Sequence, residues 1–184
     1  MDHPPSTNQR FRVNKKMLYT LLAFSFVLVS IYAYNYVQPY IGVPKRPADF
    51  EVVFRYGVRA RNVLNTSSGT YTKDMIGGDD VTLRFRLSNH ELDIIWAQIY
   101  RNKFYEMDEQ LATKWDYGPS HYDSYILSVQ AEGYPDKKVR LDFSGMGPHS
   151  EYTAPFKNIT EKVKSIIHSK PVIWFLPKPT GGYA

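Results

Sequence analysis

The sequence predicts an α+β protein, with one N-terminal transmembrane helix followed by a mainly antiparallel sheet covered by two helices, in the order β-β-β-β-α-β-β-α. Three observations support this fold class. Residues 17–37 form an uncharged apolar stretch, several later runs are rich in β-prone residues, and two later segments carry apolar residues at helical spacing. We therefore expect a cytoplasmic tail (1–16), a transmembrane helix (17–37), a linker (38–48) and an extracytoplasmic α+β domain (49–184).

The apolar stretch MLYTLLAFSFVLVSIYAYNYV is the strongest single signal in the chain. As a helix rising 1.5 Å per residue it would be about 31 Å long, which matches the hydrocarbon core of a bilayer. Tyrosines gather at its C-terminal end, where aromatic rings favour the headgroup region, and Pro39 follows as a helix stop. The sequence therefore predicts a single membrane span through residues 17–37.

Positive charge predicts the orientation of this span. Four basic residues precede Met17 within eight positions, whereas the next basic residues after the span are Lys45 and Arg46. We expect the N-terminus in the cytosol and the domain outside the cell membrane. A cleaved signal peptide is the alternative, but the stretch is longer than usual for one, and the best cleavage sequence, ending at Ala33, has Ile31 where a small residue is preferred.

The net charge of +5 comes from the membrane-flanking part of the chain. Residues 1–47 hold six basic residues and one acidic residue, so residues 48–184 hold 17 of each sign. A neutral domain has no general attraction to polyphosphate, and nucleic acid is therefore not an expected partner. The absence of cysteine excludes disulfides, thiolate metal sites, cysteine nucleophiles and a lipid-modified cysteine anchor.

The domain begins with four predicted strands. Residues 50–58 alternate between apolar and polar side chains, as expected for a strand with one buried face. The runs NVLNT and TYTKDMI, joined by Ser67, Ser68 and Gly69, predict a hairpin because glycine permits the positive φ of a tight turn. GGDD predicts a second turn, and VTLRFRL at residues 81–87 is the clearest alternating strand.

Two helices and a second hairpin complete the predicted domain. Ser88 and Glu91 form a capping box before a helix at about 89–103. YDSYILSVQAE and KKVRLDF, separated by GYPD, predict two paired strands. Thr153 is a candidate N-cap for a second helix that Pro171 ends, and the apolar tail from Val172 is expected to lie against the domain.

Several of these segments carry a resemblance. YGV at 56–58, NVLNT and GTYTKDM within 62–75, and the closing LPKPTGGY resemble uncharacterised membrane-anchored or lipoprotein-type extracytoplasmic proteins of Gram-positive bacteria. The likeness covers residues 50–184. Some such proteins anchor through a lipobox cysteine; this chain has none, so the helix at 17–37 would take that role. The resemblance implies a location at the cell envelope, and no catalytic or binding residue carries over from it.

The acidic residues of the domain suggest two kinds of site. Asp74, Asp79 and Asp80 beside a glycine turn offer oxygen ligands for a hard cation such as Ca²⁺, although their spacing is not that of an EF-hand and turn chemistry alone explains them. A carboxylate pair for glycoside hydrolysis would come from a loop that is better explained as a solvated segment. That loop contains Glu106, Asp108 and Glu109.

Nucleophilic and histidine sites have weaker support. Lys73 near Ser67 or Ser68 could pair with a serine, but no strand-serine-helix elbow is present. No two histidines have the i, i+4 spacing of a helical metal site. His121 and His149 lie in polar loops and could still converge on a carboxylate, which leaves a metal or acid-base site open beside the simpler interpretation of surface loops.

Four arginines occupy the polar phase of predicted strands: Arg55, Arg84, Arg86 and Arg140. They would form a basic stripe on one surface of the sheet, able to bind an anionic polymer of the envelope, lipid headgroups or a membrane protein. The alternative is a solvated face in which residues such as Glu51 and Asp142 neutralise them.

These patterns favour a binding or structural module at the cell envelope that needs no metal or cofactor. An enzyme is not favoured, because no recognisable reaction centre appears. The alternative is an envelope hydrolase with a site assembled from loops 106–123 and 144–153, and a third hypothesis is a sensor that dimerises through its helix, which lacks a GxxxG motif.

Overall fold

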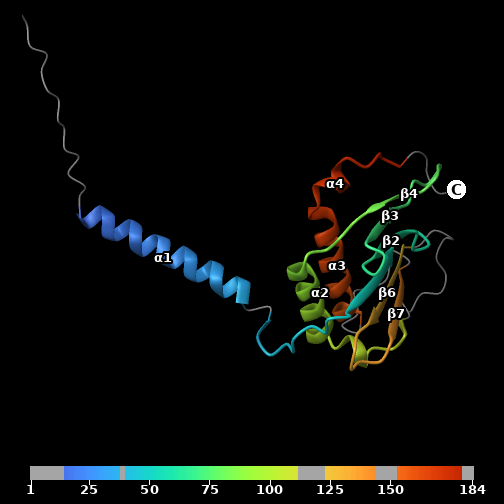
Figure 1. Ribbon diagram of the computed structural model, residues 1–184, viewed down its shortest axis with the longest axis horizontal. Helices are drawn as coiled ribbons and strands as arrows, with labels where there is room; N and C mark the ends of the chain where they lie inside the picture. Colours follow the sequence, from blue (N-terminus) through green and yellow to red (C-terminus); the bar gives the residue numbers. More distant parts are fainter. Residues whose placement is uncertain (1–14, 38–39, 112–122, 144–152, 180–184) are drawn as a thin grey trace, which may run out of the picture. The chain divides into compact units, whose positions relative to one another are not determined.

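The structure, a computed structural model, describes residues 15–37, 40–111, 123–143 and 153–179 (Figure 1). The chain divides into two compact units, Met1–Ile41 and Gly42–Ala184.

The first unit contains one helix, α1 (Lys15–Val37), of 23 residues. Within it Lys15–Tyr34 is long and apolar enough to cross a membrane, with a hydropathy of 1.8, and none of its side chains is buried. The helix ends at the predicted residue, Val37, and begins two residues earlier than predicted, so that it also includes Lys15 and Lys16. A membrane span and a signal sequence both fit this helix.

The second unit is built on one seven-stranded sheet with the order β4-β3-β2-β1-β6-β7-β5. Every neighbouring pair is antiparallel except β5 with β7, which is parallel. The strands are β1 (Glu51–Tyr56), β2 (Asn62–Asn65), β3 (Thr70–Lys73), β4 (Val81–Arg84), β5 (Gln110–Leu111), β6 (Asp123–Gln130) and β7 (Lys137–Phe143).

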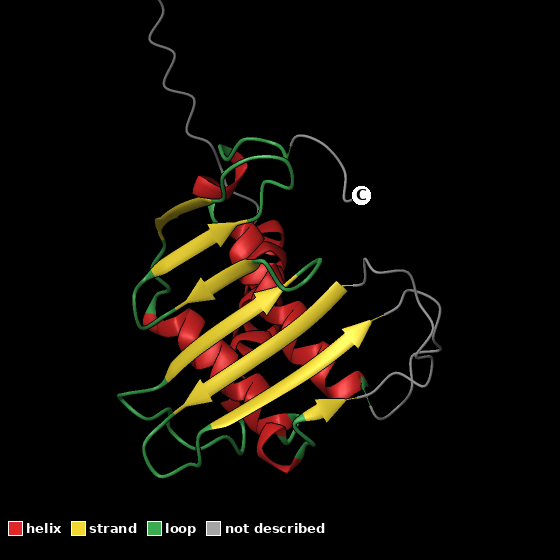
Figure 2. Cartoon of the chain, turned by 90° about the vertical axis from the view of Figure 1, so that its right-hand side faces the viewer, coloured by secondary structure: helices red, strands yellow, loops and turns green. Residues whose placement is uncertain are grey.

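Helices cover one face of this sheet. Figure 2 shows α2 and α3 crossing behind the strands, while no helix crosses the near face in the described part of the chain. The α+β class and the mainly antiparallel sheet are therefore confirmed. The helical segments are α2 (Asn89–Arg101), the 3-10 turn η2 (Phe104–Glu106), α3 (Ala154–Ser169) and α4 (Pro171–Trp174).

The predicted element order was wrong in two places. β5 lies between α2 and β6 and pairs parallel with the end of β7, and α4 follows α3. A two-residue strand has no period that a sequence can show, because it exists only through its pairing with a distant strand. Here the backbone N–H of Arg140 donates to the carbonyl of Glu109 at 2.8 Å.

The core lies between the sheet and the two helices, and the predicted strand phases are confirmed there. Val52 and Phe54 of β1 are fully buried, and their polar neighbours point to the other face. β4 is shorter than the alternation of residues 81–87 suggested, and it lies at the edge of the sheet. The apolar stripe of α3 is buried throughout: Phe156, Ile159, Val163, Ile166 and Ile167.

The hairpin predicted around the NTSSGTYTKDMIGGDD segment is present. β2 and β3 pair with Asn65 opposite Thr70, and the side-chain oxygen of Asn65 accepts hydrogen bonds from the backbone N–H groups of Ser67 and Ser68. Gly69 has a φ of 65°, which favours glycine. The segment is thus a turn whose polar side chains satisfy its own backbone.

The helix ends match the sequence only in part. Ser88 and Glu91 form the predicted capping box at the start of α2. Thr153 precedes α3, but its side chain makes no capping hydrogen bond, and Pro155 in the first turn supports the start of the helix instead.

The prediction that the apolar tail packs against the domain was right for some residues and wrong for others. Ile173 and Leu176 pack on the core, whereas Trp174 and Phe175 are 71% and 85% exposed.

Candidate functional site

The most extensive candidate surface is the face of the sheet that faces away from α2 and α3, which we call the open face. Strand alternation places on it the side chains that are not buried in the core. Its central members are Val53, Arg55, Val63, Asn65, Thr70, Thr72, Thr82, Arg84, Ile126, Ser128, Lys138 and Arg140.

Strand register places the basic residues of the open face in two neighbouring rows. In one row Arg84 pairs with Thr70, and the row continues through Asn65 and β1 to Lys138 on β7. In the next row Arg55 lies opposite Ile126, which lies opposite Arg140. Because neighbouring strands are about 4.8 Å apart, Arg84 lies roughly 14 Å from β1. The predicted stripe is therefore a spread of separate cations across the face.

Arg140 is neutralised by a neighbour. Its Nε lies 2.8 Å from Oδ2 of Asp142, whose other oxygen accepts a hydrogen bond of 2.6 Å from the Ser124 hydroxyl. Burial alone would raise the pKa of Asp142, but the hydrogen bonds from Arg140 and Ser124 outweigh it and hold that pKa below its ordinary value. The alternative of an ion-paired face is thus right for Arg140.

The other predicted arginines have no such partner among the described residues. Arg55 and Arg84 are exposed and form no salt bridge with any residue that the structure describes. Arg86 is also exposed and forms no salt bridge with a described residue. It lies beside the β2–β3 turn, since a Cβ added to Gly69 would be 3.3 Å from the Cγ of Arg86. Within the part of the chain that the structure describes, no carboxylate neutralises these three guanidinium groups.

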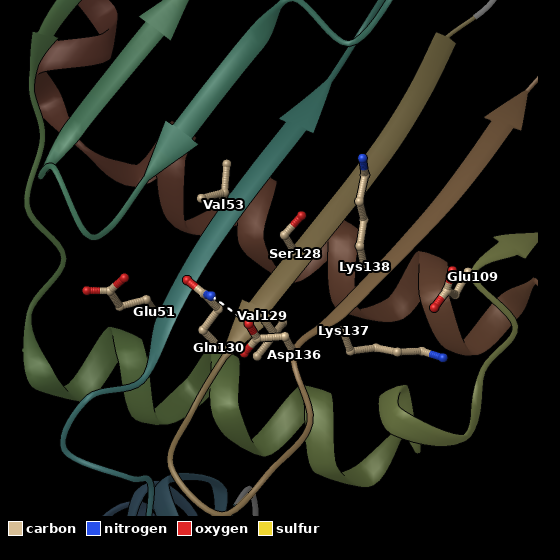
Figure 3. Close-up of a pocket in the computed structure, with 9 residues that line it drawn as sticks. All are labelled: Glu51, Val53, Glu109, Ser128, Val129, Gln130, Asp136, Lys137 and Lys138. Atoms are coloured by element: carbon tan, nitrogen blue, oxygen red, sulfur yellow. Dashed lines mark hydrogen bonds between the residues drawn. The ribbon is translucent and has the colours of Figure 1, made fainter.

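The open face also has a hollow of about 370 Å³ near the β6–β7 turn (Figure 3). Val53, Ser128 and Lys138 are among the residues that line it, and the Gln130 amide donates to Asp136 at 2.9 Å. Lysines line it together with the carboxylates of Glu51, Glu109 and Asp136, so it offers hydrogen-bond donors and acceptors of both signs. This arrangement suits a hydroxyl-rich group better than a bare anion.

Lys138 and Ser128 were not singled out from the sequence. The signal was present, because Lys138 shares the phase of Arg140 in KKVRLDF. The sequence does not show which strands pair with β6. Ser128 and Lys138 come beside Val53 only because β6 pairs with both β1 and β7.

Two of the three aspartates considered for a cation, Asp74 and Asp80, are held by an arginine instead. Arg61 lies 3.5 Å from Asp74 and 3.1 Å from Asp80, and Asp74 is buried. A guanidinium beside these oxygens occupies the position that a metal ion would need. Within the described residues, no cluster of three or more metal-ligating side chains occurs.

The serine–lysine pairing is also absent from the described geometry. The ammonium of Lys73 donates to the Pro177 carbonyl at 2.8 Å, and the Ser68 hydroxyl lies 2.6 Å from that of Thr70. Each group is thus used to fasten a segment of the fold.

The residues of the hydrolase hypothesis lie mainly outside the described part of the chain. His121 and His149 both fall there, so their convergence stays a prediction. Glu106, Asp108 and Glu109 are exposed, and Glu106 pairs with Lys103 at 3.4 Å.

The chain matches no family model and no curated protein sequence. We therefore infer function from the open face itself.

Proposed function

We propose that this chain is a single-pass membrane protein whose N-terminus is cytoplasmic and whose domain lies outside the membrane, where the open face binds an anionic, hydroxyl-bearing polymer of the cell envelope. The observation that carries the proposal is a group of exposed arginines, with no salt bridge to any described residue, on a sheet face that no described helix covers. Arg55 and Arg84 form this group, and Arg86 follows β4 beside the β2–β3 turn.

The charge of the open face supports an anionic ligand. Arg55, Arg84 and Lys138 lie on it without a salt bridge to any described residue, while its carboxylates are Asp142, already bound to Arg140, and those of Glu51, Glu109 and Asp136 around the hollow. Residues 48–184 are neutral overall, so attraction to an anion would come from these individual cations and not from the net charge of the domain. A guanidinium presents parallel N–H groups that match two oxygens of a phosphate or carboxylate.

The remaining chemistry of the face favours a ligand with hydroxyl groups. The hydroxyls of Thr72 and Thr82 form a hydrogen bond of 2.8 Å on the open face. The hollow beside Ser128 offers both hydrogen-bond donors and acceptors. A phosphate-linked polyol chain combines both requirements, because its phosphates meet the arginines and its hydroxyls meet the polar hollow. Double-stranded nucleic acid would require a higher density of positive charge.

A binding titration tests the proposal directly. Full-length protein in lipid nanodiscs is titrated with poly(glycerol phosphate), comparing wild type with the double variant Arg55→Glu, Arg84→Glu. We expect the variant to lose about 1 to 2 kcal/mol, or roughly tenfold in affinity, and the binding of the wild type to weaken as salt rises.

The matched control is Lys103→Glu, Lys162→Glu, which reverses two exposed cations of the helical layer with the same change of net charge. It should bind as the wild type does. Equal losses in both variants would show a general charge effect and would exclude the open face as the binding surface.

A further inference from the structure

A small hollow lies between the β2–β3 turn and the first turn of α2, and we call it the turn notch. Its volume is about 210 Å³, and its lining includes Ser67, Ser68, Gly69, Arg86, Leu87 and Leu92. The described residues that line it include one cation, Arg86, and no carboxylate, whereas three carboxylates line the hollow near the β6–β7 turn. The turn notch therefore favours an anion.

A glycine allows the Arg86 side chain to lie over the turn. Gly69 has a φ of 65°, and a Cβ there would lie 3.3 Å from Cγ and 3.5 Å from Nε of Arg86. A larger residue would push the Arg86 side chain away from the turn. The packed stem thus holds at the turn notch a positive charge that no described carboxylate neutralises.

The turn itself is fastened by its own hydrogen bonds. The Val52 N–H donates to the Thr66 hydroxyl at 2.8 Å, and the Phe85 N–H donates to the Gly69 carbonyl at 2.7 Å. The side chain of Asn65 accepts from two further N–H groups of the same turn. Because the turn is already ordered, a ligand would bind there without a large loss of conformational entropy.

Two serine hydroxyls accompany the charge of Arg86. Both serines are exposed, and the Ser67 hydroxyl forms no hydrogen bond with a described residue. The Ser68 hydroxyl lies 2.6 Å from that of Thr70 and keeps its own hydrogen for a ligand when Thr70 donates. The guanidinium adds two parallel N–H groups, which match two oxygens of a phosphate. The turn notch therefore offers an oxyanion donors from three side chains.

The two carboxylates that flank Leu92 in the chain are both paired with cations. Glu91 lies 2.6 Å from the Lys170 ammonium, and Asp93 lies 2.7 Å from Nε of Arg46. Each carboxylate is thus compensated by its own partner. The start of α2 therefore does not cancel the attraction of Arg86 for an anion.

The size of the turn notch limits its ligand to one small group. Sites for whole small molecules measure about 300 to 1,000 Å³. The turn notch, with about 210 Å³, is smaller. Leu87 and Leu92 give it an apolar wall that suits the carbon atoms of an ester. These features favour a single phosphate group over a nucleotide.

We propose that the turn notch is a binding site for one phosphate group, held by Arg86 and the Ser67 hydroxyl. The group is either inorganic phosphate or the phosphate of a small ester. This site is separate from the open-face proposal, because Arg86 lies beyond the end of β4 and its partners belong to the β2–β3 turn.

The test uses full-length protein in a maltoside detergent, which contains no phosphorus. Inorganic phosphate and glycerol phosphate are titrated at constant ionic strength, and binding is followed by the broadening of the phosphorus NMR line. Arg86→Gln should weaken binding about tenfold, and Ser67→Ala about threefold. Both variants should fold normally because both side chains are exposed, which urea unfolding verifies.

The matched control is Arg84→Gln, which removes the same charge two residues earlier, on the open face. It should bind phosphate as the wild type does. Equal losses in Arg84→Gln and Arg86→Gln would show a general charge effect and overturn the proposal, as would a wild type that leaves the phosphorus line unchanged.

Two further arms identify the ligand. Acetate should not displace phosphate at constant ionic strength, and displacement at equal concentrations would overturn the assignment to phosphate. Tighter binding of glycerol phosphate than of inorganic phosphate supports an ester as the ligand, and the reverse order supports free phosphate. Loss of poly(glycerol phosphate) binding in the Arg55→Glu, Arg84→Glu variant, with phosphate binding retained, would show that the two sites act separately.

Discussion

Glu91 connects three parts of the domain through one carboxylate. Its oxygens accept hydrogen bonds from the Ser88 backbone at 2.7 Å and the Ser88 hydroxyl at 2.9 Å, and the Lys170 ammonium lies 2.6 Å away. Burial alone would raise the pKa of Glu91, but the bonds from Lys170 and Ser88 outweigh it and lower that pKa. The start of α2 is thereby joined to the end of α3.

Replacing Glu91 by glutamine keeps the capping box and removes the charge. We expect Glu91→Gln to lower the free energy of unfolding by about 1 to 2 kcal/mol at neutral pH. Because the folded-state pKa is lowered, this contribution is present above the unfolded pKa of about 4.3 and disappears as pH falls through the folded value. Urea unfolding from neutral pH to about pH 3 should therefore show wild type and variant converging in acid.

The control for this prediction is Glu106→Gln, because Glu106 and its partner Lys103 are both largely exposed. This variant should match the wild type closely at every pH. A constant difference between Glu91→Gln and wild type across the pH range would contradict the role of the charge.

At the residue scale, local contacts were predictable and distant ones were not. The Ser88–Glu91 capping box follows from a spacing of three residues, whereas Lys170 is 79 residues from Glu91 in the chain. Arg140 and Asp142 are only two residues apart, and Asp142 was accordingly among the residues expected to neutralise the arginines.

At the element scale, the connection between β1 and β2 depends on a glycine. Gly57 has a φ of 86°, and a Cβ there would lie 2.7 Å from the side-chain nitrogen of Asn62. That nitrogen donates to the Tyr56 carbonyl at 3.2 Å, and the Asn62 oxygen accepts from the Asp74 backbone at 3.2 Å. A methyl group at this position would displace the amide that closes the connection.

Gly57→Ala should therefore cost more than backbone strain alone. We expect a loss of about 2 kcal/mol in the free energy of unfolding, compared with about 1 kcal/mol for Gly133→Ala. Gly133 also has positive φ, of 82°, but a Cβ there meets no atom within 4 Å. Denaturant unfolding of both variants separates the two effects, and equal losses would show that the Asn62 contacts contribute nothing.

The elements that the sequence revealed are those with enough residues to show a period. β1, β6 and β7 each bury alternate side chains, and α3 buries a full apolar stripe, so their phases were predictable. β5 and α4 are too short for this. The uncovered side of the sheet was also not predictable, because a polar strand face looks the same in sequence whether solvent or a charged partner meets it.

At the scale of the whole molecule, the arrangement across a membrane is open to a labelling experiment. Because the chain has no cysteine, Ser6→Cys and Ser165→Cys each provide one reactive thiol. In intact cells a membrane-impermeant maleimide should label only Ser165→Cys, and after lysis it should label both. Labelling of Ser6→Cys in intact cells would contradict the orientation, and loss of the N-terminal residues from the membrane-bound protein would favour a cleaved signal sequence.

The central claim is that the open face of the sheet is the binding surface. The measurement that tests it most directly is the rate at which a maleimide labels Ser128→Cys, on the open face, and Ser165→Cys, exposed on α3, in full-length protein with and without poly(glycerol phosphate). Our account predicts that the polymer slows labelling of Ser128→Cys and leaves Ser165→Cys unchanged. Unchanged labelling at Ser128→Cys, or equal slowing at both positions, would contradict it.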